Sequence, residues 1–376
     1  MTLTVRIKTL TPLWTGGLDG TMDRIHETGI LGSLRWWYEA IVRGLGGSAC
    51  APTEPRCELT GQRLRLYEKA REEGKDWWQA LDKAGICDAC KVFGATGWKR
   101  RFRLEVKSDT QLTWQPRDSV LNIRPPERAR GWYLLPGHVG TLTLKLEGEE
   151  KVVSMLACLF LWLEKYGSLG ARPQLGYGAF RILNRDEVVE KAGGWKWGLL
   201  QKEAQNASPN SKGKTPDHPD LRRLLFFRYE FTPSKPGWWT QVPGVSRVGS
   251  RVQPLVTHWH TVPTTPALKN EWRFNQWQGN RREEVEIFGT LHPDRRRGRI
   301  GATWAYRENG VWFIHGWAWM PQKERLAGQL WKILADESVW AHVLGVQGNL
   351  TTVPSGQWKE LTSEDVRKLL QGVCHD

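Results

Sequence analysis

Four cysteines occur in two pairs whose spacing suits a metal ion. Cys50 and Cys57 lie in the stretch CAPTEPRC, and Cys87 and Cys90 lie in the stretch CDAC. In a reducing compartment such pairs favour a zinc site over two disulfides, because each pair can supply two soft thiolate ligands to one tetrahedral ion. Four thiolates leave no open position for water, so the sequence predicts a structural zinc and no metal catalysis. A disulfide or an unliganded set of thiols is the alternative.

Basic side chains form a second group. They occur in two runs, and each run follows a shared phrase, KVFGAT at 91–96 and EIFGTL at 286–291. The repeated phrase indicates an internal duplication. Charge runs are usually solvated surface, but two runs at corresponding positions favour a continuous RNA-binding track. The residues are Lys99, Arg100, Arg101 and Arg103 in the first run, and Arg295, Arg296, Arg297 and Arg299 in the second.

Adjacent tryptophans occur in the motif RWWYEA at 35–40. Neighbouring helix residues point about 100° apart, so only Trp37 joins the apolar stripe through Leu34. Trp36 falls outside that stripe, beside Arg43 and near Arg35. A flat aromatic ring among guanidinium groups can stack on an RNA base while the arginines neutralise phosphate. Packing of Trp36 beneath the loop 11–29, or against the cysteine-bearing segment, is the alternative.

A glycine-rich loop, GSLGARPQLGYGAF at 167–180, is a further candidate. Glycine permits positive φ and a close approach of backbone N–H groups to phosphate oxygens. Arg172 supplies the charge of this loop, and Arg24 lies in the loop before the tryptophan helix. We count both among the predicted RNA-binding residues. A tight turn is the alternative, and the loop lacks the GK[ST] ending of a P-loop.

Acid–base chemistry on RNA is the competing activity. His26 lies in the loop after the first expected strand, beside Asp23, Arg24 and Glu27. A general base there could activate a 2′-hydroxyl without a metal. No second catalytic group is evident, and THWHT at 257–261, expected on a strand with both histidines on one face, lacks further ligands. We therefore expect no enzymatic activity.

The composition describes a soluble globular protein with an anionic partner. The 376 residues are long enough for two domains, with 40% hydrophobic and 25% charged residues. The formal net charge is +14, which favours RNA or another polyanion. The apolar run VVSMLACLFLWL at 152–163 is too short to span a bilayer, and its Cys158 is expected to be a free thiol. No signal peptide is evident, so we expect a cytoplasmic protein without a membrane partner.

Hydrophobic periodicity orders the elements of the first half. Alternation predicts strands at 3–9, 101–107, 140–148 and 177–183, with helices at 30–45 and 150–166. A cysteine-bearing insertion at about 46–92 includes an expected helix over 62–83. The order β-α-β-β-α-β is that of a ferredoxin-like, RRM-like domain. We assign this domain to residues 1–200.

The second half repeats the pattern after a polar segment. Residues 201–220 lack apolar periodicity and are predicted to be a linker. In the second domain, 221–376, we expect a strand at 221–231 and a hairpin over 303–320 that turns at Asn309-Gly310. A helix at 324–337 and a closing strand in WAHVLGV at 340–346 follow. The predicted fold class is α+β, with two ferredoxin-like domains.

The order of four motifs resembles a known family. TPLWTGG, GILGSLRWWYEA, KVFGATG and the glycine-rich loop follow one another as in CRISPR RAMP proteins, and the chain is most similar to the first subunits of the Cmr (type III-B) effector complex. The resemblance implies two ferredoxin-like domains, binding of CRISPR guide RNA or complementary target RNA in antiviral defence, and other Cmr-type RAMP subunits as partners. It also implies that other subunits cleave the target. A metal-independent RAMP endoribonuclease that processes CRISPR RNA, and a protein-only scaffold, are the alternatives.

Overall fold

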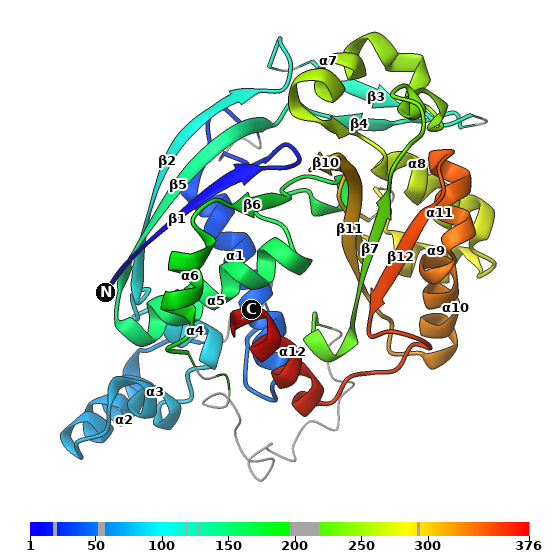
Figure 1. The fold of residues 1–376 in the computed structure, drawn as a ribbon. Helices are drawn as coiled ribbons and strands as arrows, with labels where there is room; N and C mark the ends of the chain where they lie inside the picture. The colour runs from blue at the N-terminus through cyan, green and yellow to red at the C-terminus, as the bar shows by residue number, and fades with distance from the viewer. Residues whose placement is uncertain are drawn as a thin grey trace.

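The structure is a computed structural model of the whole chain. It describes residues 1–17, 21–51, 57–117, 119–126, 128–195, 197, 218–291 and 294–375. The predicted linker 201–220 lies outside the described residues except for its last three positions. The α+β class with antiparallel sheets is confirmed (Figure 1).

The first sheet contains four strands in the order β2-β5-β1-β6. They are β1 (Thr2–Thr9), β2 (Phe102–Leu112), β5 (His138–Gly148) and β6 (Phe180–Ile182), and every pair is antiparallel. The alternation expected in β1 is present, because Leu3, Val5 and Ile7 are buried while the residues between them are partly or fully exposed. Helices α1 (Glu27–Gly44) and α5 (Glu150–Tyr166) share one hydrophobic core with these side chains.

Three helices separate α1 from β2. They are α2 (Gly61–Glu72), α3 (Trp77–Lys83) and α4 (Asp88–Phe93), and α2 and α3 project from the body of the molecule (Figure 1). The single helix expected over 62–83 is broken into two. Gly74 has a φ of 80°, and the Asp76 carboxylate then caps α3 by accepting a hydrogen bond from the Gln79 N–H at 2.7 Å.

A small hairpin of the first half packs on the core of the second half. Its strands are β3 (Leu121–Ile123) and β4 (Trp132–Leu134). Leu121, Ile123 and Leu134 are fully buried in the hydrophobic cluster that contains the second sheet. This hairpin follows β2 and was not predicted from the sequence.

The second sheet has the order β12-β7-β11-β10-β8, with β9 also paired to β11. Its strands are β7 (Leu224–Phe231), β8 (Thr261–Val262), β9 (Ile300–Ala302), β10 (Ala305–Glu308), β11 (Val311–Trp319) and β12 (Gly348–Val353). The predicted hairpin turn is confirmed, because Asn309 and Gly310 have φ values of 49° and 87° between β10 and β11. The helices of this half are α7 (Gly249–Trp259), α8 (Thr265–Asn270), α9 (Arg281–Phe288), α10 (Glu324–Ala335) and α11 (Glu337–Leu344).

Two local predictions are wrong. The segment 340–346 was expected to be the closing strand, but it belongs to α11, whose Trp340, Val343 and Leu344 are buried at helical spacing. The closing strand is β12. THWHT was expected on a strand, but His258 lies in the last turn of α7 and His260 caps that helix with a φ of 51°, so the two imidazoles do not share a strand face.

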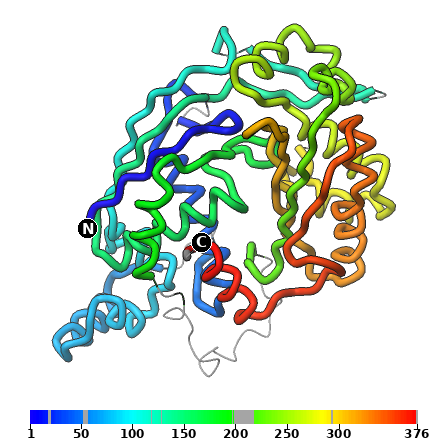
Figure 2. Tube along the Cα trace, in the orientation of Figure 1, coloured from blue at the N-terminus to red at the C-terminus, as the bar shows by residue number. Residues whose placement is uncertain are grey.

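The last helix of the chain lies with the first half. Helix α12 (Ser363–His375) packs against α5 and α6 (Arg185–Ala192), as the tube in Figure 2 shows near the C-terminus. Cys374 of α12 forms a disulfide with Cys158 of α5. The prediction that Cys158 is a free thiol is therefore wrong, because a partner distant in sequence lies against it in the fold. Within the described ranges, no helix combines the length and the apolar character needed to cross a membrane.

Candidate nucleic-acid interface and metal centre

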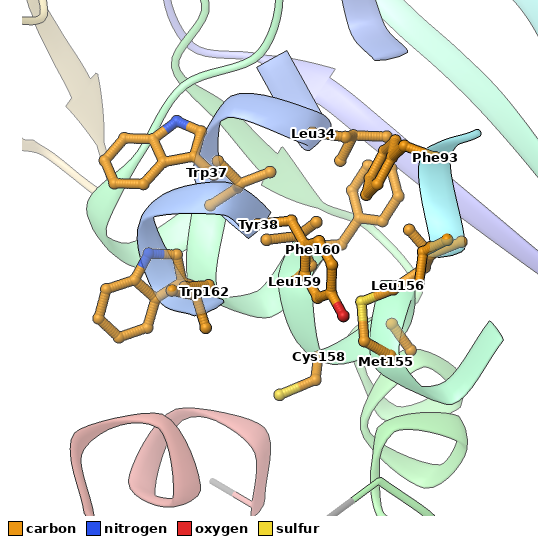
Figure 3. Packing of buried hydrophobic residues seen from close by; sticks show 14 of the residues in the cluster. Leu34, Trp37, Tyr38, Phe93, Met155, Leu156, Cys158, Leu159, Phe160 and Trp162 are labelled. Carbon is orange, nitrogen blue, oxygen red and sulfur yellow. The ribbon is translucent and has the colours of Figure 1, made fainter. Parts of the chain in front are cut away.

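Helix α1 divides the two adjacent tryptophans as the periodicity predicted. Leu34, Trp37 and Tyr38 are buried in the core; in Figure 3, Leu34 lies beside Phe93, whereas Trp37 points to the side of Trp162 of α5. Trp36 is half-buried and packs on Trp317 of β11. The ring centroids of Trp36 and Trp317 are 5.1 Å apart. The aromatic partner of Trp36 outside α1 thus belongs to the second half.

The two arginines of α1 bind protein groups. Arg35 donates to the buried Glu39 carboxylate at 2.8 Å and to the Cys90 sulfur at 3.3 Å. Arg43 donates to the carbonyl oxygens of Cys50 at 2.7 Å and Pro219 at 2.9 Å. Burial raises the pKa of Glu39, and the two guanidinium groups oppose that rise. These contacts place both arginines beside the cysteines rather than on an open RNA-binding face.

The four cysteines predicted to bind metal come together. Their sulfur atoms all lie within 4.8 Å of one another, and all four side chains are buried. Cys50 Sγ lies 3.2 Å from Cys57 Sγ, 3.5 Å from Cys87 Sγ and 3.9 Å from Cys90 Sγ. A tetrahedral zinc with Zn–S bonds of about 2.3 Å requires sulfur separations of about 3.8 Å, so the cluster has the size and the ligand chemistry of such a site.

Hydrogen bonds within the cluster shift the pKa values of two of its thiols in opposite directions. Those with Cys87 and Cys90 lower the pKa of Cys57 to about 4, whereas those with Cys57 and Cys87 raise the pKa of Cys90. The Arg35 guanidinium donates to Cys90 from outside the cluster. Helix α4 carries Cys87 and Cys90 and is fixed by the buried Lys91, which pairs with Asp82 at 2.6 Å and Asp88 at 2.7 Å. These residues could hold one metal ion.

The repeated phrases adopt the same local structure. Helices α4 and α9 end at Phe93 and Phe288, and each phenylalanine is followed by a glycine of positive φ. We call the segments that follow, 94–101 and 289–299, the first and second F-G turns. The Arg101 N–H donates to the Val92 carbonyl at 3.0 Å, and the Arg299 N–H donates to the Ile287 carbonyl at 2.8 Å. The predicted duplication is thus visible as a repeated helix–turn–arginine unit.

The arginine that closes each F-G turn packs into the protein. Arg101 pairs with Glu149, and its guanidinium lies 4.9 Å from the Trp77 ring. Arg299 is buried, donates to the Glu286 carbonyl at 3.2 Å and lies 4.3 Å from the Trp319 ring. Arg101 and Arg299 therefore stabilise the positions of the two F-G turns on the rest of the protein.

The remaining cations of the two turns differ in exposure. Arg100 is partly buried and donates to the Phe102 carbonyl at 2.7 Å, while Lys99 is exposed. Arg295, Arg296 and Arg297 are exposed, and none of them forms an ion pair with a residue that the structure describes. The charge available to a ligand is thus concentrated in the second F-G turn.

The glycine-rich loop is wedged between the two halves. Arg172 has a φ of 63°, and its guanidinium lies 3.8 Å from the Trp14 ring. Gly176, with a φ of 92°, accepts a hydrogen bond from the Trp304 N–H at 3.2 Å, and the Trp304 indole donates to the Leu175 carbonyl at 2.7 Å. A Cβ at Gly176 would meet Trp304 at 2.2 Å, so glycine is required for this approach.

Arg172 connects the loop to the second F-G turn. Burial lowers the pKa of Arg172, Tyr177 opposes this effect, and the nearby charge of Arg295 lowers it further. The Trp14 segment is joined in turn to Arg24, because the Thr15 hydroxyl donates to the Arg24 carbonyl at 3.3 Å. The exposed Arg24 side chain and Arg172 therefore flank one loop.

Arg100 of the first F-G turn is influenced by a charge at the start of α1. Burial lowers the pKa of Arg100, and the Glu27 carboxylate at the start of α1 opposes that effect. Glu27 follows the loop that carries Arg24 directly in the chain. The predicted cations thus separate into one group that binds protein groups and another that is not fastened in this way. The first group is Arg35, Arg43, Arg101 and Arg299, and the second is Arg24, Lys99, Arg100, Arg172, Arg295, Arg296 and Arg297, of which all but Arg100 and Arg172 are exposed.

His26 contacts Asp23, one of the neighbours that the sequence places beside it. Its Nε2 lies 2.6 Å from the Asp23 carboxylate. The charge of Asp23 also acts on His138 at the start of β5. Burial lowers the pKa of His138, the charge of Arg117 lowers it further, and the charge of Asp23 raises it. Sequence reasoning missed His138 and Arg117, because β5 is distant from the first loop in sequence and no motif singled them out.

Comparison with known proteins matches part of the chain to one family model. Residues 6–181 match the model of the RAMP superfamily. No curated protein matches the chain. Among solved structures, the chain is similar to the apo crystal structure of Cmr1 from Pyrococcus furiosus, with a TM-score of 0.44, 14% identity, and coverage of 94% of this chain and 98% of that one. It is also similar to a chain in a cryo-EM structure of the type III-B Cmr-beta bound to cognate target RNA and AMPPnP, with a TM-score of 0.36, 11% identity and coverage of 98% of both chains. The resemblance to the RAMP superfamily that the sequence motifs indicated is confirmed over residues 6–181.

Proposed function

We propose that this chain is a non-catalytic RNA-binding subunit of a type III-B CRISPR (Cmr) ribonucleoprotein effector. It would bind guide RNA, target RNA or both in antiviral defence, together with other Cmr-type RAMP subunits. The proposal rests mainly on the exposed cations, above all Arg295, Arg296 and Arg297 of the second F-G turn. The RAMP match over residues 6–181 and the net charge of +14 support it.

A salt titration tests this proposal. Each phosphate contact adds about 0.7 to the slope of log affinity against log salt for single-stranded RNA. Replacing Arg295, Arg296 and Arg297 with alanine should therefore lower the slope by about 2 and weaken binding with little regard to RNA sequence. Fluorescence anisotropy of labelled single-stranded RNA with the full chain measures both quantities.

A matched control separates this surface from general charge loss. Replacement of Arg65, Lys69 and Arg71 with alanine removes three exposed charges from the projecting helix α2. This control should retain the wild-type slope if the second F-G turn binds phosphate. Equal slopes for both triple variants would refute the proposed surface.

Two ferredoxin-like domains are part of the proposal. In the first half, the order β2-β5-β1-β6 is the order that a βαββαβ unit with antiparallel strands requires. In the second half, β12-β7-β11-β10 repeats that order. We accordingly infer that the cysteine-bearing segment between α1 and β2 is an insertion in the first domain.

A structural zinc is the metal we propose for the four cysteines. Four thiolates close the coordination sphere, so the ion would stabilise the fold of the insertion and would not activate water. We also propose a cytoplasmic location, which suits a site of four thiolate ligands because thiols stay reduced there. The Cys158–Cys374 disulfide is compatible with this location, since both residues are almost fully buried and shielded from soluble reductants.

A second candidate function is metal-independent RNA cleavage. The Asp23–His26 contact, with His138 nearby, supplies a second imidazole that the sequence did not place there. We nevertheless propose no catalysis, because Asp23 is exposed and burial disfavours the charged form of His138 that a general acid requires. Single-stranded RNA should remain intact with the pure chain in the presence of a chelator. Cleavage that is lost in both His26→Ala and His138→Ala would establish the second candidate.

A further inference from the structure

A small cavity lies beside both ends of the second F-G turn. Its volume is about 10 Å³, which is room for about one water-sized group. One wall comes from Lys269 in α8 and from Arg273 in the π-helix that follows it (Glu271–Gln276). Trp132 of β4 forms a second wall. The other lining residues flank or belong to the ends of the turn, and they are Ile287, Phe288, Gly298 and Ile300.

Lys269 is a buried cation whose charge is not neutralised. The residue is only 6% exposed, and its ammonium forms no ion pair or hydrogen bond with any residue that the structure describes. None of the residues around the cavity is acidic, and Arg273 is already paired with Glu284 at 2.6 Å. The ammonium lies 5.9 Å from the Trp132 ring, and a cation–π contact at that distance offsets only part of the cost of removing a charge from water.

The protonation of Lys269 is sensitive to an anion. Burial, and after it the charge of Arg273, lowers the pKa of Lys269 to about 7. An anion beside the ammonium would raise this pKa again, because it stabilises the charged form. The other charged groups near the cavity have partners of their own, since Glu284 of α9 binds Arg273 and Arg299 at the end of the turn pairs with Glu286.

The position of the cavity indicates which anion reaches Lys269. Trp132, Arg273, Phe288 and Gly298 are partly exposed, so the cavity opens to the surface. Gly298 directly follows Arg297, the last of the three exposed arginines of the turn. A run of three arginines beside one lysine is matched by a chain that carries a negative charge on every unit, as an RNA backbone does. One phosphate oxygen fits the cavity, whereas a whole nucleotide does not.

We propose that Lys269 binds a phosphate oxygen of the RNA that the second F-G turn holds, at the opening of the cavity beside Arg273. This inference rests on the proposed RNA-binding function and adds to it a buried contact that the sequence did not single out. The exposed arginines would meet phosphate in water, whereas Lys269 would bind an oxygen that has left water.

Lys269→Met tests the inference in the full chain, because methionine retains an unbranched apolar side chain and lacks the charge. At about pH 6, where Lys269 is charged, the variant should lower the salt slope of single-stranded RNA binding by about 0.7 and weaken binding about tenfold. Lys83→Met is the matched control, since Lys83 is exposed on the projecting helix α3. The urea midpoint of Lys269→Met should rise, because an uncompensated buried charge is removed, so weaker binding would not reflect unfolding.

Proton uptake is a second readout and requires no variant. At about pH 8 the amine of the free chain is mostly neutral, whereas a bound phosphate favours the ammonium. Isothermal titration calorimetry of the wild-type chain in two buffers of different ionisation enthalpy should show uptake of about one proton per RNA bound. RNA affinity should accordingly fall as the pH rises above about 7. Both effects should be lost in Lys269→Met and retained in Lys83→Met.

The outcomes separate this inference from the proposed function. Wild-type affinity and salt slope in Lys269→Met, or no proton uptake by the wild-type chain at about pH 8, would overturn the role of Lys269. The RNA-binding proposal would still stand if the triple variant of Arg295, Arg296 and Arg297 lost salt slope, whereas a wild-type chain that binds no RNA would overturn both. Inorganic phosphate is the probe for a free anion. If it raises the unfolding temperature of the wild-type chain but not of Lys269→Met, while both bind RNA equally, the ligand is a free anion and the inference is wrong.

Discussion

Replacing Trp36 with alanine distinguishes packing from base stacking. The Trp36 ring lies 5.1 Å from Trp317 with an interplanar angle of 38°, and 4.8 Å from Trp37 in an edge-to-face contact. A fully buried tryptophan contributes about 3–5 kcal/mol relative to alanine. Because Trp36 is half-buried, we expect Trp36→Ala to lower the free energy of unfolding by about 2 kcal/mol. A base-stacking role would instead cost about 1–3 kcal/mol of RNA affinity.

A double-mutant cycle with Trp317→Ala measures the contact directly. Urea unfolding should give a coupling energy of about 1 kcal/mol between the two rings, the magnitude typical of aromatic pairs. Tyr133→Ala is the control, because that ring is 59% exposed and its loss should change stability by less than about 0.5 kcal/mol. Wild-type stability of Trp36→Ala together with weakened RNA binding would refute the packing assignment.

Contacts elsewhere in the structure support three further predictions. Arg299→Ala should lower the free energy of unfolding and leave the salt slope of RNA binding unchanged. Arg297→Ala should lower that slope by about 0.7 and leave the free energy of unfolding unchanged. Salt titrations of RNA binding and urea unfolding of both variants check these two expectations. Cys87→Ser should abolish binding of the proposed zinc, about one ion per chain by elemental analysis, and destabilise the first half, while Cys158→Ser should retain the metal. Burial lowers the pKa of His315 from 6.5 to about 4. The contribution of the neutral His315 to the free energy of unfolding is therefore complete above about pH 6.5. Up to about 3 kcal/mol of that free energy is lost as the pH falls from about 6.5 to about 4. His315→Gln should flatten this part of the pH–stability curve.

Periodicity in the sequence predicted the elements whose environment is local. Strand β1, helix α1 and the Asn309-Gly310 hairpin follow from alternation, an apolar stripe and turn chemistry, each of which depends on adjacent residues. The prediction of a strand at 340–346 was wrong because Trp340, Val343 and Leu344 suit a buried helix as well as a short strand. The cysteine cluster was predicted correctly as a group, because two close pairs restrict how ligands can meet.

The roles of individual arginines could not be predicted from charge alone. Arg101 and Arg299 stand in the same runs as exposed cations, yet each packs beside a tryptophan that is distant in sequence, Trp77 and Trp319 respectively. Only the fold brings those rings to the turns. The pairing of Cys158 with Cys374 has the same origin, since 216 residues separate the two sulfurs.

The position of α12 has a consequence for the order in which this protein matures. Chains generally fold from the N-terminus during synthesis, so the first sheet and α5 form while later residues are still being translated. The core of that first half also includes Val366, Leu370 and Val373 of α12. We expect the part of α5 that α12 covers to stay open to water until α12 has left the ribosome. During that interval the first half is a target for chaperones and proteases, and a premature stop codon before Ser363 would damage the part of the molecule that was made first.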